Sequence, residues 1–125
     1  MVNRAKVIKS HQSEVLTPFQ AEKGDIVVGK EKTTQWEGWL YCKNKDGIYG
    51  WVPKAFVSSV KNSSEEFRFI RDYNSFEISV SKEEFVKIHE IESGWAIIEN
   101  ESGKIGWIPL ENLEINNRMY KLKKT

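Results

Sequence analysis

The residues best suited to chemistry in this sequence are four tryptophans that each follow a glycine: Trp39, Trp51, Trp95 and Trp107. Two of them stand in Gly-Trp-hydrophobic-Pro motifs, which end at Pro53 and Pro109. Indole rings are large and rigid, and they supply much of the contact energy at binding surfaces. The chemistry that these motifs favour is non-covalent binding of a ligand by aromatic faces.

The other reactive residues do not indicate a catalytic or metal site. The sequence places no second carboxylate or histidine to work with Glu77 in proton transfer. His11 and His89 are isolated, and Cys42 is the single cysteine, so we expect neither a metal cluster nor an internal disulfide. The sequence therefore predicts a non-enzymatic protein with no cofactor and no metal, in which Cys42 is a small core residue.

An internal repeat organises the 125-residue chain. Gly38-Trp39 recurs as Gly94-Trp95, and Gly50-Trp51-Val52-Pro53 recurs as Gly106-Trp107-Ile108-Pro109, both at an offset of 56 residues. A fixed repeat of this kind predicts two small domains of one type. We expect domain 1 over residues 1–60, a linker over 61–66, domain 2 over 67–116 and a basic tail over 117–125.

The net charge of +1 conceals an uneven distribution along the chain. Residues 1–60 hold 9 Lys/Arg and 6 Asp/Glu, whereas residues 61–116 hold 6 and 12. The acidic second copy favours a basic partner, and neither copy has the dense basic face of a nucleic-acid binder. No apolar run approaches the length of a membrane span, and the N-terminus lacks the apolar segment of a signal peptide. We expect a cytoplasmic protein without a nucleic-acid or membrane partner.

Short runs rich in β-branched and aromatic residues, separated by turn residues, predict strands. The expected strands in the first copy are Arg4–Lys9, Asp25–Gly29, Gly38–Lys43 and Ile48–Val52. Those in the second are Phe67–Asp72, Glu84–His89, Gly94–Glu99 and Lys104–Ile108. Tight turns are expected at residues 44–47 and 100–103, where glycine accepts a positive φ. The pattern predicts an all-β chain with brief or absent helices.

The order of these motifs resembles the Src homology 3 (SH3) family, in its variant or bacterial type, over about residues 4–57 and 67–115. Phe69-Ile70-Arg71-Asp72-Tyr73 resembles the first strand of that family, Lys23-Gly24-Asp25 an internal turn, and the Gly-Trp-x-Pro motifs the segment before the last strand. The resemblance implies two small five-stranded SH3-like β-barrels in tandem. It also implies a trough of aromatic residues that binds a polyproline II peptide, beside an acidic loop that orients it.

The resemblance assigns ligand-binding residues position by position. In the second copy they are Tyr73, Glu77, Trp95, Trp107 and Pro109. In the first copy they are Trp39, Trp51, Pro53 and Phe56. Arg71 and Asn112 stand at aromatic positions of the second trough. In the first copy Val7 and Lys9 stand at the tyrosine positions, and Pro18 stands in the place of the orienting acid.

Three functions follow from this sequence. The leading hypothesis is a protein-interaction module that binds an extended, basic, proline-containing peptide. The second is a structural or assembly pair with vestigial grooves, whose tryptophans lie between the copies or in a homodimer. The third is binding of cell-wall peptides or glycans, as in bacterial SH3-like domains.

Overall fold

The computed structural model describes residues 3–13, 17–32 and 34–115. These residues form strands and two short 3-10 helices, and the predicted all-β class is confirmed. No helix in this described part has the length and apolar character needed to cross a membrane. In the order of the chain, the elements are β1 (Asn3–Val7), β2 (Gln20–Ala21), β3 (Ile26–Glu31), β4 (Trp39–Lys43), β5 (Tyr49–Pro53), η1 (Lys54–Phe56), β6 (Val57–Ser59), β7 (Glu66–Phe69), β8 (Tyr73–Asn74), β9 (Phe85–Glu92), β10 (Trp95–Glu99), β11 (Ile105–Pro109), η2 (Leu110–Asn112) and β12 (Leu113–Ile115).

The turns form where the sequence predicts them. Gly47 and Gly103 have φ of +80° and +85°, values that favour glycine. In each turn the asparagine side chain accepts backbone N–H bonds, as Asn44 does from Asp46 and Ile48 at 3.0 Å each. These turns join β4 to β5 and β10 to β11, and so fix the register of both tryptophan-bearing hairpins.

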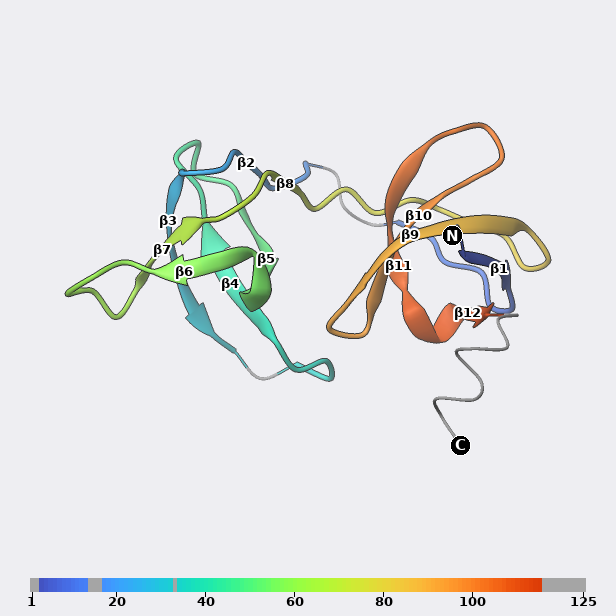
Figure 1. Cartoon of the computed structure of the whole chain (residues 1–125), viewed down its shortest axis with the longest axis horizontal. Coiled ribbons are helices and arrows are strands. Elements are labelled where there is room, and N and C mark those ends of the chain that lie inside the picture. Colours follow the sequence, from blue (N-terminus) through green and yellow to red (C-terminus); the bar gives the residue numbers. More distant parts are fainter. Residues whose placement is uncertain (1–2, 14–16, 33, 116–125) are drawn as a thin grey trace. The chain divides into compact units, whose positions relative to one another are not determined.

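The chain divides into two compact units, and the division differs from the expected domains. One unit, here called the continuous unit, is residues 15–76; the other, the split unit, combines residues 1–14 with 77–125. Each unit contains a five-stranded antiparallel sheet, ordered β5-β4-β3-β7-β6 in the continuous unit and β11-β10-β9-β1-β12 in the split unit. Figure 1 shows β1, in blue, among the orange and red strands of the split unit. The predicted tail, 117–125, lies outside the described residues.

The difference arises because the two sequence copies exchange their first strands. β1 pairs with β9 and β12 of the second copy, and β7 pairs with β3 and β6 of the first. The expected linker is consequently a hairpin loop, closed by the bond from the Val60 N–H to the Glu66 carbonyl at 3.0 Å. Short connections usually join strands that are neighbours in the sheet. The short link between the copies therefore keeps β6 and β7 together.

Side-chain volume explains which strand fits which unit. In the continuous unit Phe19 lies 6.1 Å from Phe69 and 6.2 Å from Tyr73, measured between ring centroids. In the split unit β1 contributes the smaller side chains Ala5 and Val7, both buried. Interiors are close-packed, so strands that differ by whole rings are not interchangeable. The core residues therefore favour the exchange of the two first strands.

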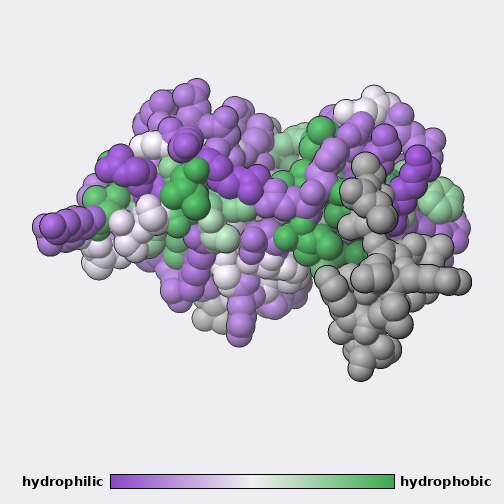
Figure 2. Space-filling view, in the orientation of Figure 1, coloured by the Kyte–Doolittle hydropathy of each residue, from purple (hydrophilic) through white to green (hydrophobic). Residues whose placement is uncertain are grey.

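The surface of both units is typical of small domains. On the face that Figure 2 shows, hydrophilic surface is interrupted by apolar patches. Nine large hydrophobic side chains are exposed among the described residues, including Phe85 and Ile105 at the β9 and β11 ends of the split unit. Domains of this size bury a smaller share of their surface than large ones do.

We predict that Gly50→Ala destabilises the continuous unit. A Cβ at Gly50 would lie 2.6 Å from the Cβ and 3.1 Å from the Cγ of the fully buried Phe19. Overpacking of this kind costs about 1–3 kcal/mol. Urea denaturation measures the loss; Gly47→Ala is the control, because nothing lies within 4 Å of its Cβ and only its φ of +80° is unfavourable. A Gly50→Ala protein as stable as the wild type would contradict the packing described here.

Cys42 should resist thiol reagents in the folded protein. Burial in the core raises the pKa of its thiol to about 12, and the thiolate is the reactive species. At pH 8 we expect a chromogenic disulfide reagent to react slowly with the native protein and at the rate of a free cysteine in urea. A rapid reaction without denaturant would show that Cys42 is accessible.

Candidate functional site

The predicted ligand-binding residues are distributed over the two units in a new combination. The continuous unit holds Trp39, Trp51, Pro53, Phe56 and Tyr73, and the split unit holds Glu77, Trp95, Trp107 and Pro109. Tyr73 and Glu77, which the resemblance assigns to one trough, therefore belong to different units. The strand exchange places Tyr73 in one unit with the aromatic residues of the first copy, whereas Glu77 lies in one unit with those of the second copy.

The registers also correct the comparison between the copies. Phe69 pairs with Val57 in the continuous unit, and Val7 pairs with Leu113 in the split unit. Val57 and Leu113 are equivalent in the repeat, so Phe69 and Val7 are equivalent as well. Lys9 then corresponds to Arg71 and His11 to Tyr73. The expectation that Val7 and Lys9 stand at the two tyrosine positions is wrong, because that alignment is shifted by two residues.

Most residues of the expected proline trough are buried. Tyr73 is 6% exposed, and Trp39, Phe56, Trp107 and both prolines are buried as well. Trp39 does lie on the sheet face opposite Leu40 and Cys42, as the strand alternation predicts, and its cross-strand partner there is Pro53. The hydroxyl of Tyr73 donates a 2.7 Å bond to the Trp51 carbonyl, and its ring meets Phe56 edge-on at 5.5 Å. These side chains act as core and give a ligand little ring surface.

An exposed aromatic row lies on the outer face of the β4–β5 hairpin. It consists of Tyr41, Tyr49 and Trp51, in which Tyr41 is directly opposite Trp51 across the strands. The ring centroid of Tyr41 lies 5.6 Å from that of Tyr49 and 5.0 Å from that of Trp51. Trp51 is 38% and Tyr49 56% exposed. Sequence reasoning did not include the two tyrosines, although the alternation along each strand places them on the face of Trp51.

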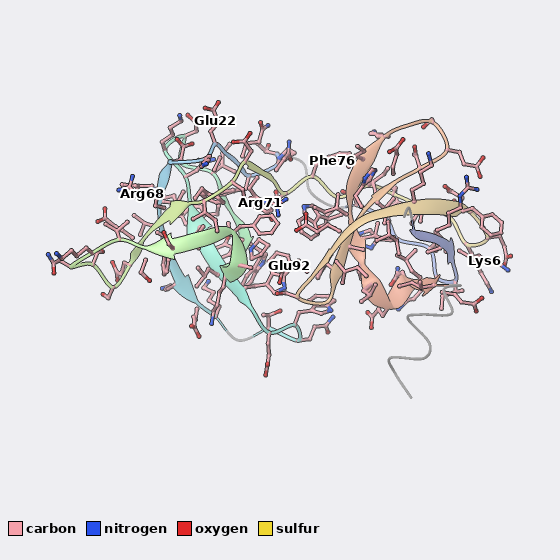
Figure 3. All side chains as sticks on the ribbon, viewed as in Figure 1. Lys6, Glu22, Arg68, Arg71, Phe76 and Glu92 are labelled. Atoms are coloured by element: carbon pink, nitrogen blue, oxygen red, sulfur yellow. The ribbon has the colours of Figure 1, made fainter. Side chains whose placement is uncertain are left out.

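Cationic side chains accompany this row. The Lys32 Nζ lies 4.3 Å from the centre of the Tyr41 ring, and the Lys43 Nζ lies 5.6 Å from that of Tyr49. Both distances are within the range of cation–π attraction. A third such contact lies elsewhere in the continuous unit, where the Arg71 guanidinium is 3.8 Å from the Phe56 ring centre; Figure 3 labels Arg71. Arg71 thus covers a ring at a position where the family has an aromatic residue.

The split unit contains a compact acidic site, here called the Glu77 pocket, formed by Glu77, Trp95 and His11. The His11 Nε2 is 2.9 Å from the Glu77 Oε1, and its ring meets the Trp95 ring edge-on at 5.9 Å and 88°. The side chains of His11 and Glu77 are 17% and 24% exposed. Glu77 forms a backbone bridge with Trp107, and the Ile78 N–H donates to the Trp107 carbonyl at 3.2 Å. Trp107 therefore supports the pocket from within the sheet.

Both histidines, which are isolated from other candidate ligands in the sequence, form a hydrogen bond with a carboxylate. His11 bonds to Glu77, and His89 lies 2.7 Å from Glu99 between β9 and β10. Asn112, which replaces an aromatic residue of the trough, is buried and donates from its Nδ2 to the Ser10 carbonyl at 3.3 Å. This bond holds the segment that leads to His11. No sequence signal pointed to His11, because its partners lie 66 and 84 residues away.

Within the described ranges, no group of three or more His, Cys, Asp or Glu residues is placed to hold a metal ion. The aromatic row and the Glu77 pocket both suit non-covalent recognition.

Comparison with known proteins gives a family for each copy. Residues 4–60 match the variant SH3 domain, and residues 57–114 match the Gly-Trp (GW) dipeptide domain. Neither the curated proteins nor the solved structures give a match. The matched ranges follow the sequence repeat and not the compact units. A family model matches residues in the order of the chain, and the exchange changes only the unit in which each first strand packs.

Proposed function

Since the chain belongs to the SH3-like family, as a variant SH3 domain followed by a Gly-Trp dipeptide domain, we propose that this binding module holds an extended peptide by a cationic side chain in the Glu77 pocket. The proposed ligand is a basic peptide that contains proline, as the sequence suggests.

The observation that carries this proposal is the convergence of Glu77 and Trp95 on one nitrogen-bearing group. The imidazole of His11 bonds to the carboxylate and lies against the indole, and a lysine or arginine side chain of a ligand can use the same two partners. The carboxylate is mostly shielded from water, so its attraction for a cation is stronger than at an open surface. Trp107 and Pro109, both buried, support this pocket from β11, because Trp107 forms a bridge with Glu77 and Pro109 pairs with Trp95.

An NMR titration of the full chain tests the proposal. The probes are a peptide of sequence acetyl-Ala-Pro-Pro-Arg-Pro-Ala-amide and the same peptide with norleucine in place of arginine. We expect the Trp95 indole signal to shift only with the arginine peptide, and the shift to disappear in Glu77→Gln. Glu99→Gln is the matched control, since it removes the same charge from the same unit outside the pocket. Equal shifts with both peptides, or an unchanged titration in Glu77→Gln, would refute a cation-binding role.

The aromatic row favours a second candidate function, binding of cell-wall peptides or glycans. The Gly-Trp dipeptide domain is an SH3-like domain that binds bacterial cell walls. Three adjoining aromatic side chains with two nearby lysines offer a rigid apolar platform and charges for a polymer. Cell-wall binding requires a location at the cell surface, whereas the peptide proposal suits the cytoplasmic location expected from the sequence. Cell fractionation distinguishes these two functions.

Co-sedimentation with purified peptidoglycan tests the second candidate. We expect Trp51→Ala and Tyr49→Ala to reduce the sedimented fraction at least severalfold. Phe85→Ala is the control, because Phe85 is an aromatic residue of similar exposure in the split unit. If Trp51→Ala sediments like the wild type, the aromatic row does not bind the wall. If neither the NMR titration nor the co-sedimentation detects binding, the structural or assembly hypothesis is favoured.

A further inference from the structure

We infer that His11 is an internal occupant of the Glu77 pocket, which a ligand's cationic side chain must displace. This inference rests on the proposed function of that pocket, and it adds a regulatory element that is carried by the exchanged N-terminal segment. His11 takes the place of the ligand because it already contacts both Glu77 and Trp95.

The geometry indicates that the His11 ring fills the Glu77 pocket and does not merely lie near it. The Nε2–H of His11 donates to Glu77 across 2.9 Å, and the ring lies edge-on to Trp95 at 5.9 Å. With the His11 side chain only 17% exposed, a ligand group cannot reach both partners while the imidazole remains in place. At the equivalent position of the continuous unit, Tyr73 is locked into the core by its bond to the Trp51 carbonyl.

The His11 side chain can leave without unfolding the strand pairing. Its backbone is held separately, by N–H···O bonds in both directions with Val80 at 3.0 and 2.9 Å. The flanking segment is fixed by the bond from Asn112 to the Ser10 carbonyl and by that from the Ser13 N–H to the Ser79 hydroxyl, at 3.3 and 2.9 Å. Rotation about the side-chain bonds of His11 therefore opens the pocket while the sheet stays intact.

Internal occupancy lowers the apparent affinity for a ligand, because the measured Kd equals the Kd of the open site divided by the fraction of molecules in which the pocket is open. If His11 fills the pocket in nine of ten molecules, the measured Kd is about tenfold higher than that of the open site. Removing the imidazole removes this competition, so affinity should increase although a contact-rich residue has been deleted. A merely structural role for His11 predicts the opposite direction.

The experiment measures the Kd of the arginine peptide for the full chain and its variants by NMR titration, with folding checked by circular dichroism. His11→Ala should lower Kd about 3- to 10-fold. His89→Ala, which breaks a similar His–Glu pair outside the pocket, should leave Kd unchanged. His11→Arg should raise Kd at least threefold, because a guanidinium can donate two hydrogen bonds to the Glu77 carboxylate and so competes more strongly for it. This variant decides the question if His11→Ala fails to fold.

The outcomes separate this inference from the proposed function. If the wild type binds and His11→Ala binds equally or more weakly, internal occupancy is wrong and the pocket's function stands. If His11→Arg binds as well as the wild type, occupancy is also wrong. If no folded variant binds the arginine peptide, the proposed function fails, and the inference fails with it.

Discussion

A fragment of residues 15–76 is expected to fold by itself, whereas a fragment of residues 1–60 is not. The first contains every strand of the continuous unit, from β2 to β8. The second ends before Phe69 and Tyr73, whose rings pack on Phe19 in the core. Its own N-terminal strand offers only Val7 in the place of Phe69. Loss of one buried ring costs about 3–5 kcal/mol, which is a large part of the stability of so small a domain.

Circular dichroism and dispersion of the NMR amide signals measure this result. We expect a cooperative urea transition for residues 15–76 and a disordered spectrum for residues 1–60. A double variant of the short fragment, Val7→Phe with His11→Tyr, is the informative control, since it restores the missing rings in cis and should recover part of the fold. If residues 1–60 fold as stably as residues 15–76, the exchange of first strands described here is wrong.

Tyr73→Ala should destabilise the continuous unit by about 3–5 kcal/mol, on the scale of other large aromatic-to-alanine changes in cores. The ring lies against Phe19, Phe56 and Phe69, at centroid distances of 6.2, 5.5 and 5.9 Å. The hydroxyl also satisfies the Trp51 carbonyl at 2.7 Å. The family resemblance alone predicts something different, which is a loss of ligand binding in the second copy with its fold intact.

Urea denaturation followed by the indole NMR signals distinguishes these outcomes. We expect the Trp39 and Trp51 signals to report the loss, and those of Trp95 and Trp107 to retain their midpoint. Tyr73→Phe removes only the hydroxyl and should cost about 1 kcal/mol. A Tyr73→Ala protein with wild-type stability and altered binding at Glu77 would support the assignment from the resemblance instead.

Local patterns in the sequence were sufficient for the fold class and for the longer strands, whereas the two- and three-residue strands β2, β6, β8 and β12 were not among the predicted ones. The strands, the two asparagine–glycine turns and the short 3-10 helices after Pro53 and Pro109 all depend on interactions between near neighbours in the chain. The alternation within β5 also places Trp51 outward and Val52 inward, as observed. The same alternation would have indicated the tyrosines of the aromatic row, which the sequence analysis did not include; the register between β4 and β5 brings them into contact.

The composition of each site depended on long-range packing. His11 reaches Glu77 because β1 belongs to the split unit. Tyr73 follows β7 and therefore belongs to the continuous unit, whereas Glu77 belongs to the split unit. Repeat matching cannot foresee this, since two similar copies offer equivalent places for either first strand. The choice depends on which side chains fill which core, and that is a property of the assembled unit.

The Gly-Trp repeat thus determined that this chain has two copies of one domain type, and the order of the motifs around it resembled an SH3-like scaffold. These features could be read from the sequence because glycine turns and strand alternation act locally. The tertiary structure alone decided which copy supplies each first strand, and therefore that Glu77 belongs to one unit with Trp95 and His11, and Tyr73 to the other. The physical reason is that either first strand can form the same backbone hydrogen bonds, whereas the packing of Phe69 and Tyr73 against Phe19 depends on the side chains.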